Sequence, residues 1–260
     1  MNEEELKLAE KKYIEHQKNI IESINHRCRL KQCADCEGYV YSLDSDGIFY
    51  ATACGTTKEK RSNDNYNRLV DFARIPKRYS NNTFSNFSFD HYEGSSRETV
   101  IDIFKKAQYY VENFPKNEQG RGFYIYSISR GVGKTRLVTT IANELIAKHR
   151  TNVRFATSLE ILNTIKGTFD NKKENEKEYL DALIGCDLLI IDDFGTEKAK
   201  DWSDERWYSI INARYQDCRP TIYTSNLTID SLGYESRIKD RMIETSMELR
   251  FPEMKSLRRK

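Results

Sequence analysis

The chain has 260 residues, enough for one full α/β domain and a smaller module. It holds 42 basic and 40 acidic side chains, and the resulting net charge of +2 gives no evidence for nucleic-acid binding. Its mean hydropathy is −0.75, and no stretch approaches the ~18 apolar residues of a membrane span. Met1 is followed by Asn-Glu-Glu-Glu, unlike the basic start of a secretory signal. We therefore expect a cytoplasmic protein with no membrane association.

Apolar side chains recur at near-helical spacing among Glu and Lys over residues 2 to about 26, which predicts an amphipathic helix. The apolar face of such a helix either packs against its own domain or binds a partner. The sequence leaves both alternatives open.

Cysteines crowd the next segment, where four of the six lie between residues 28 and 54. In a cytosolic chain such cysteines are more often metal ligands or free thiols than disulfides. A Cys-x-x-Cys pair has the spacing of a metal knuckle, and a hairpin signal at Asp46-Gly47 follows it. The expected ligands of a structural Zn²⁺ are Cys28, Cys33, Cys36 and Cys54, with His26 as the alternative to Cys28. Reduced free thiols are the alternative to metal binding.

Residues 55 to 97 are polar and loop-like, with clusters of Asn and Ser. Aromatic residues within this segment either dock it onto the core or line an adenine pocket. These residues are Phe84, Phe87, Phe89 and Tyr92. An amphipathic helix is expected from Thr99 to Phe114.

A phosphate-binding loop is predicted where a short strand, Phe123 to Tyr126, is followed by glycines and Lys134-Thr135. Lys134 and Thr135 open a helix that runs to about His149. Glycines let backbone N–H groups curl around phosphate oxygens, and the helix N-terminus adds partial positive charge. In the full P-loop pattern the first glycine would fall on Ile128. The residues expected to bind ATP here are Ser129, Arg130, Gly131, Val132, Gly133, Lys134, Thr135 and Arg136.

The second half of a nucleotide site is predicted at residues 187–195, an apolar strand that ends in two carboxylates. Asp192 is expected to hold Mg²⁺ together with the hydroxyl of Thr135. Asp193 is expected to orient or deprotonate the attacking water. The two halves together predict ATP hydrolysis.

Strands and helices alternate through the rest of the chain, which predicts a parallel sheet covered on both faces. Further strands are expected at 152–157, 219–226 and 248–251, and helices at 158–169, with Ser158 as N-cap, and at 203–216. The charged run at 170–178 is interpreted as an exposed connection. Asn226, at the tip of a strand, either positions the attacking water or caps a turn. We divide the chain into an N-terminal module at 1–57, a linker at 58–85 and an ATPase domain at 86–260.

Arg237 and Arg241 lie four residues apart, on one face of a predicted helix. Surface arginines are usually only solvated. A protruding arginine can instead reach the nucleotide of a neighbouring subunit and stabilise the transition-state charge.

The whole arrangement resembles the AAA+ helicase loaders of the DnaC/DnaI type, within a wider group that includes IstB-type transposition ATPases. The resemblance covers most of the chain, in which the family's motifs come in order: CADCEGYV, IPKRY, TFSNF, GVGKT, LLIIDDFG, TIYTSNL and SRIKDRM. It implies an AAA+ P-loop fold with a five-stranded parallel sheet flanked by helices, plus the small N-terminal helix and zinc knuckle. By this resemblance the Walker A residues are Lys134 and Thr135, the Walker B residues Asp192 and Asp193, sensor 1 Asn226, and the arginine finger Arg241, with Arg237 nearby.

The resemblance also implies partners. The N-terminal module would bind a replicative hexameric helicase, which the protein would place on single-stranded DNA, and subunits would associate through their ATP sites. The knuckle and IPKRY favour a loader, because the transposition ATPases look like the core without a zinc module. Two alternatives stay open: a transposition ATPase acting on duplex DNA, and an adaptor that uses ATP only as a switch.

Overall fold

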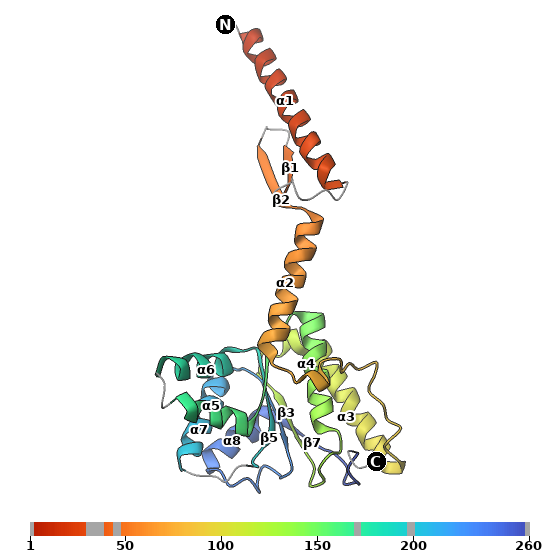
Figure 1. Cartoon of the computed structure of the whole chain (residues 1–260), viewed down its shortest axis with the longest axis vertical. Helices are drawn as coiled ribbons and strands as arrows, with labels where there is room; N and C mark the ends of the chain where they lie inside the picture. Colours follow the sequence, from red (N-terminus) through yellow and green to blue (C-terminus); the bar gives the residue numbers. More distant parts are fainter. Residues whose placement is uncertain (1–2, 30–38, 44–47, 169–172, 197–200, 258–260) are drawn as a thin grey trace. The chain divides into compact units, whose positions relative to one another are not determined.

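The structure is a computed structural model and describes residues 3–29, 39–43, 48–168, 173–196 and 201–257 (Figure 1). Packing divides the chain into two compact units, Met1–Asn67 and Arg68–Lys260, and each is described by itself. Within the described ranges, no helix has the length and apolar character that crossing a bilayer requires.

The first unit contains the predicted N-terminal helix, α1 (Glu3–Arg29), and a hairpin of β1 (Tyr39–Leu43) and β2 (Phe49–Ala53). Asn25 joins helix and hairpin: its amide donates to the carbonyl of Tyr41 at 2.6 Å, and its Oδ1 accepts the N–H of Tyr41 at 2.9 Å. Of the apolar residues on α1, Ile21 is buried while Tyr13 and Ile20 are 66% and 41% exposed. The helix therefore packs part of its apolar surface and leaves another part in solvent.

The loop-like interpretation of residues 55 to 97 is wrong for its first part, which forms α2 (Gly55–Ala73). The helix begins directly after Cys54, whose sulfur accepts the N–H of Thr57 at 3.3 Å and so acts as an N-cap. Apolar residues of α2 recur at helical spacing only in its second half, so the polar first half concealed the pattern. Residues 74–93 do follow an irregular course, with one 3₁₀ turn, η2 (Lys77–Tyr79).

The second unit is built on a five-stranded, all-parallel sheet in the order β4-β5-β6-β3-β7, which confirms the predicted parallel sheet. The strands are β3 (Gly122–Tyr126), β4 (Val153–Thr157), β5 (Leu188–Phe194), β6 (Thr221–Ser225) and β7 (Ser246–Arg250). The helices are α3 (Gly94–Asn113), α4 (Lys134–His149), α5 (Ser158–Thr168), α6 (Lys173–Gly185), α7 (Asp201–Gln216) and α8 (Ser236–Thr245), and a 3₁₀ turn, η3 (Phe114–Lys116), follows α3.

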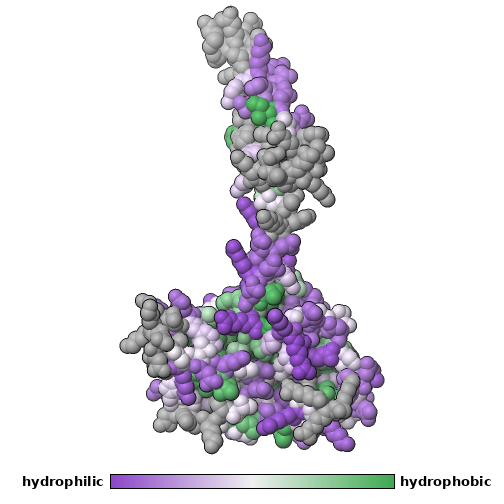
Figure 2. All heavy atoms as spheres, viewed as in Figure 1, coloured by the Kyte–Doolittle hydropathy of each residue, from purple (hydrophilic) through white to green (hydrophobic). Residues whose placement is uncertain are grey.

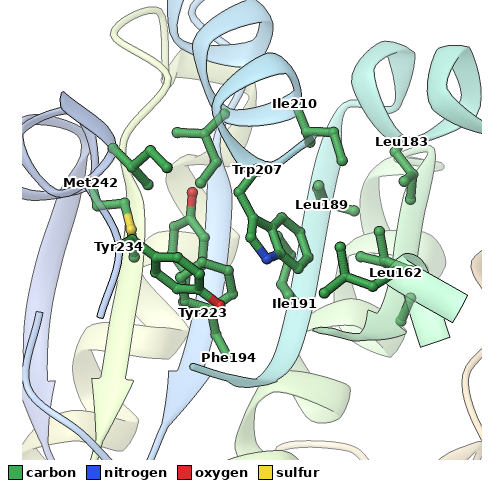
Figure 3. Close-up of a cluster of buried hydrophobic side chains, with 14 of the residues drawn as sticks. Leu162, Leu183, Leu189, Ile191, Phe194, Trp207, Ile210, Tyr223, Tyr234 and Met242 are labelled. Atoms are coloured by element: carbon green, nitrogen blue, oxygen red, sulfur yellow. The ribbon is translucent and has the colours of Figure 1, made fainter. Parts of the chain in front are cut away.

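Helices cover both faces of this sheet: α3 and α4 lie on one side, and α5 to α8 on the other (Figure 1). On the second side the indole of Trp207, from α7, lies among Leu189, Ile191 and Phe194 of β5 (Figure 3). Leu188 and Ile190, which alternate with Leu189 and Ile191, are also fully buried, as expected for a strand covered on both faces. The irregular pairing before Phe194 returns this ring to the side of Trp207. The surface of this unit seen in Figure 2 is largely hydrophilic, with apolar side chains in small separate patches.

Two local expectations in this unit are wrong. The N-cap of α5 is Thr157 rather than Ser158, because Thr157 Oγ1 accepts the N–H of Glu160 at 3.2 Å. In the reciprocal bond the Thr157 N–H donates to Glu160 Oε2 at 2.9 Å. The charged run is helical from Lys173 onward, within α6. Glu176 in this helix pairs with Arg206 at 3.4 Å, so the run is not merely a solvated connection.

The aromatic residues that follow η2 dock onto α3. The rings of Phe84, Phe87 and Phe89 all lie 5.0–5.1 Å from the ring of Phe104. These three residues therefore dock the segment onto the core and do not line an adenine pocket. Tyr92 has a separate place, against the phosphate-binding loop.

Candidate nucleotide-binding site

The predicted P-loop connects the end of β3 to the first residue of α4, at the carboxyl edge of the sheet. Gly131 and Gly133 adopt positive φ angles of 73° and 106°, which only glycine takes up without strain. Ile128 takes the position of the missing glycine. It does not have a positive φ angle, and its side chain is 67% exposed. The loop therefore accommodates a β-branched residue there without backbone strain or a clash.

Tyr92 supports the loop from behind. Its hydroxyl donates to the carbonyl of Val132 at 2.8 Å, and burial raises the pKa of Tyr92 to about 12, so the hydroxyl keeps its proton. A Cβ added to Gly133 would lie 2.4 Å from this hydroxyl oxygen. Gly133 is thus required twice, by its backbone conformation and by the closeness of Tyr92.

Lys134, the first residue of α4, is buried, and its ammonium group contacts three oxygens. Nζ donates to the carbonyls of Ser127 and Ser129 at 3.4 and 3.2 Å and to Oδ1 of Asn226 at 2.9 Å. The lysine charge is therefore held at the mouth of the loop, beside the tip of β6. This is the position from which a lysine can bind the terminal phosphates of a nucleotide.

Asp192, at the end of β5, faces the start of α4. The Thr135 hydroxyl donates to its two carboxylate oxygens at 3.1 and 3.0 Å, and the Thr224 hydroxyl donates to Oδ1 at 2.5 Å. Burial raises the pKa of Asp192 to about 6, although the bonds from the two threonines oppose this shift. A hydroxyl and a carboxylate side by side are the hard oxygen ligands that Mg²⁺ prefers, so these residues fit the predicted metal. Sequence reasoning missed the role of Thr224.

Asp193 occupies an irregular position in β5, where the pairing with β6 shifts between Ile191 and Phe194. Its φ is 54°, rare for a non-glycine residue. Hydrogen bonds fix this conformation: the Asp193 N–H donates to Thr224 Oγ1 at 3.0 Å, and its carbonyl accepts the Ser158 hydroxyl at 3.0 Å. The irregularity turns the side chain of Asp193 outward, while that of its neighbour Asp192 stays buried. The two adjacent carboxylates therefore have different surroundings and can serve different roles.

A cavity of about 550 Å³ joins these groups. Its lining includes the P-loop from Arg130 to Arg136, together with Asp193 and Asn226. The other lining residues, which sequence reasoning did not assign to the site, are Arg78, Tyr79, His91, Thr196 and Leu257. Arg78 and Tyr79 belong to the IPKRY motif, which could have indicated from the sequence that they line the site. Leu257 comes from the C-terminal segment, and its N–H donates to the carbonyl of Gly131 at 3.0 Å.

Two of the predicted P-loop residues have other contacts. Arg136 lines the cavity but donates to the carbonyl of Asn86 at 2.6 Å, and its guanidinium lies 5.2 Å from the ring centre of Phe87. Ser129 is outside the cavity lining and offers its carbonyl to Lys134. The structure thus brings most of the predicted ATP-binding residues together, with these two in supporting positions.

Arg237 and Arg241 do not line the cavity. The Arg241 guanidinium donates to Oδ1 of Asn212 at 2.9 Å and to the Tyr208 hydroxyl at 3.3 Å. Arg237 is the more exposed of the two and lies 4.0 Å from the ring centre of Tyr208. Within one subunit, neither arginine is a ligand of the nucleotide site.

The predicted zinc site falls largely beyond the described residues. This applies to Cys33, Cys36 and the side chains of Cys28 and His26. Cys54 is buried, and its sulfur lies 3.1 Å from the Thr57 hydroxyl in addition to its bond from the Thr57 N–H. In the described ranges, no three His, Cys, Asp or Glu side chains gather as a metal site.

A phosphate-binding loop after β3, a buried carboxylate on β5 and an amide at the tip of β6 define a P-loop nucleotide-binding protein of the AAA+ type. The chain belongs to the family of IstB-like ATP binding proteins, which it matches over residues 56–251. That range takes in every residue of the site except those contributed by the last segment of the chain, such as Leu257.

Similarity to individual proteins is consistent with this family assignment. The chain is 29% identical over 189 residues to YqaM, an uncharacterised protein of Bacillus subtilis strain 168, covering 70% of this chain and 56% of YqaM. It is 30% identical over 159 residues to the replicative helicase loader DnaC of Escherichia coli K12, covering 60% of this chain and 63% of DnaC. The matched stretch thus spans less than two thirds of either relative. A crystal structure of the DnaC helicase loader has the same fold, with a TM-score of 0.58 at 24% identity over 68% of this chain and 99% of that one.

Proposed function

We propose that the protein is an ATP-dependent helicase loader that binds a replicative hexameric helicase and delivers it onto single-stranded DNA in the cytoplasm. The observation that carries the proposal is the exposed apolar surface of α1, with Tyr13 and Ile20 seven residues apart on one helical face. This helix precedes the family match, which begins at residue 56. A nucleotide-binding site and a separate helix with an exposed apolar face are the two parts expected of an ATPase that binds and acts on a partner protein.

The geometry supports a division of roles in ATP hydrolysis. Lys134 binds the terminal phosphates, while Thr135 and Asp192 hold Mg²⁺, which when bound neutralises developing phosphate charge. Asp193, exposed beside the cavity, accepts a proton from the attacking water or orients it, and Asn226 fixes the position of that water. Subunits associate through their ATP sites, and an arginine of α8 reaches the nucleotide of the neighbouring subunit.

The domain division of the sequence is part of this proposal. Residues 1–57 form the helicase-contacting module, with Zn²⁺ bound by Cys33, Cys36, Cys54 and either Cys28 or His26 as its structural metal. The bond from the Thr57 N–H to the Cys54 sulfur also fits a metal-bound thiolate, because such a donor stabilises charge on sulfur. The Thr57 hydroxyl, 3.1 Å from the same sulfur, would donate to a thiolate as well. Metal analysis of protein purified without added zinc should give about one Zn²⁺ per chain, and Cys33→Ser should lose it. Absence of zinc, with normal folding of Cys33→Ser, would exclude this part of the proposal.

The test of the main proposal is size-exclusion chromatography with light scattering on mixtures with the replicative helicase of the host, with and without ATP. We expect a discrete complex that deletion of residues 1–57 abolishes. A matched surface variant, Tyr13→Ser with Ile20→Ser, should weaken the complex without changing ATP binding. The control is Glu15→Ser, on the opposite face of the same helix, which should leave the complex intact. Failure of the intact protein to bind the helicase under any nucleotide condition would contradict the loader assignment.

A transposition ATPase acting on duplex DNA is the second candidate, favoured by the match to IstB-like proteins. This candidate predicts a complex with a transposase and duplex DNA in the same chromatographic assay, and no zinc. The two functions are therefore separated by partner and by metal content.

A further inference from the structure

A second cavity, of about 580 Å³, lies at the opposite end of the sheet from the nucleotide site. It is formed by α3, η3 and the amino-terminal ends of β3 and β7, through residues such as Phe123 and Met247. The P-loop follows the carboxyl end of β3, so the two cavities occupy opposite edges of the sheet. The proposed reaction uses none of the residues that line this second cavity.

The cavity combines aromatic surface with positive charge. Its floor includes the rings of Tyr110 and Phe123, whose centres lie 4.6 Å apart, while Tyr109 and Met247 at the rim are 69% and 51% exposed. A large exposed aromatic ring beside an apolar hollow is a surface that can stack on a further planar group.

Four basic residues surround this hollow, and none of the residues that line it is acidic. Lys106 pairs with Asp102 at 2.8 Å, but among the described residues no carboxylate pairs with Lys105, Lys116 or Arg121. A cavity edged by uncompensated cations is complementary to an anionic ligand.

Part of this rim is held in a fixed conformation. The Asn117 side chain donates to the carbonyl of Arg121 at 2.7 Å and accepts the Arg121 N–H at 3.1 Å, which closes the turn between η3 and β3. Gly120 in this turn has a φ of 61°, and a Cβ there would meet the Cys218 carbonyl oxygen at 2.2 Å. The turn therefore presents Arg121 from a constrained backbone.

We propose that this cavity is a contact site for single-stranded nucleic acid, with one base against Tyr109 and the apolar floor and the phosphates on Lys105, Lys116 and Arg121. The polar groups at the rim are mainly hydrogen-bond donors, which pair with the phosphate and base oxygens of a nucleic acid. A peptide is less well matched, because its backbone N–H groups would also need acceptors. Stacking aromatics beside a basic track are the usual means of binding single strands. The inference rests on the proposed function and adds the place where the DNA strand is held.

The test measures binding of a fluorescein-labelled oligo-dT to the full-length protein by anisotropy, at several salt concentrations. Tyr109→Ala should weaken binding about tenfold or more, because it removes a stacking surface. Lys105→Glu should weaken binding and lower the salt dependence, because it removes a phosphate contact. The matched control is Arg97→Glu, an exposed basic residue on the same helix outside the cavity, which should bind like the unmodified protein.

Two further measurements make the result decisive. Oligo-dT containing 5-bromodeoxyuridine should cross-link to Tyr109 on irradiation, and each variant should keep its melting temperature and ATP affinity. Unchanged oligo-dT binding by both cavity variants, or no binding by the unmodified protein, would overturn the proposal. Loss of the helicase complex with intact DNA binding would also overturn it and assign the cavity to a protein segment. The helicase complex is measured without DNA, so failure of this site is distinguishable from failure of the loader function.

Discussion

Lys134 and Asn226 are 92 positions apart in the chain, yet the lysine Nζ donates to the asparagine Oδ1 at 2.9 Å. The contact exists because β3 and β6 are neighbours in the sheet and both deliver their following residues to the same edge. It links the phosphate-binding loop to the residue proposed to position water.

Hydrolysis should therefore be separable from binding by substitutions at this edge. Asn226→Ala and Asp193→Asn should each keep ATP affinity within a few-fold and lower the turnover rate about a hundredfold, the usual effect of removing one catalytic contact. Lys134→Ala should abolish binding itself. Fluorescent-ATP titration and single-turnover hydrolysis measure the two effects, with Asn63→Ala on α2 as the control. If Asp193→Asn keeps full helicase-loading function, the protein uses ATP only as a switch.

The stability of the fold should depend on the charge of Asp192. Burial raises the pKa of Asp192 from its ordinary 3.8 to about 6, so the folded protein binds this proton more tightly than the unfolded chain. The free energy of unfolding should therefore rise as the pH falls from about 6 to about 4, by as much as ~3 kcal/mol from this group. Above pH 6 that stabilisation is lost.

Asp192→Asn should remove most of this pH dependence and raise the melting temperature at pH 8, while abolishing Mg²⁺-dependent hydrolysis. Urea unfolding between pH 4 and 8 measures the effect, and the control is Asp181→Asn, an exposed carboxylate on α6. In the unmodified protein hydrolysis should decline below about pH 6, because the proton competes with Mg²⁺. A stability profile of Asp192→Asn that parallels that of the unmodified protein would contradict the assignment.

Gly133→Ala should weaken ATP binding at least tenfold, since it strains a φ of 106° and places a methyl group against Tyr92. Combining it with Tyr92→Phe removes the hydroxyl contact but not the backbone strain, so only part of the affinity should return. Gly167→Ala, in α5 with nothing within 4 Å of its Cβ, is the matched control and should be neutral or slightly stabilising. Normal affinity of Gly133→Ala would refute this geometry of the loop.

The two arginines of α8 should respond differently to truncation. Arg241→Ala should lower stability by about 1–2 kcal/mol, because it removes the bonds to Asn212 and Tyr208. Arg237→Ala should leave the melting temperature nearly unchanged and lower hydrolysis only in the assembled protein. Lys239→Ala, between them, is the control.

Mixing subunits tests whether either arginine acts across an interface. Protein carrying Arg237→Ala keeps its own ATP site, and protein carrying Lys134→Ala keeps its arginine. Hydrolysis that recovers on mixing identifies Arg237 as the residue acting in trans, and the same experiment with Arg241→Ala examines the other candidate. No recovery in either mixture would rule out a finger on α8.

The sequence by itself determined where the strands lie along the chain, and it located the P-loop and the two adjacent carboxylates. These features depend on local spacing and on apolar runs. The helix α2 was missed because its first half is rich in Thr, Ser, Asn and Asp, which have low helix propensity, and only its second half carries an apolar face. The sequence also placed the cap of α5 one residue late, because serine is by type the better capping residue, whereas the fold gives the cap to Thr157.

Only the tertiary structure decided how distant residues divide the work of the site. Tyr92 and Leu257 support the loop from 40 positions before it and from the end of the chain, contacts that no local pattern encodes. The different surroundings of Asp192 and Asp193 come from an irregular pairing of β5 with β6, held by the Thr224 hydroxyl. Burial and partner bonds set the proton affinity of a carboxylate, and both are properties of packing rather than of sequence.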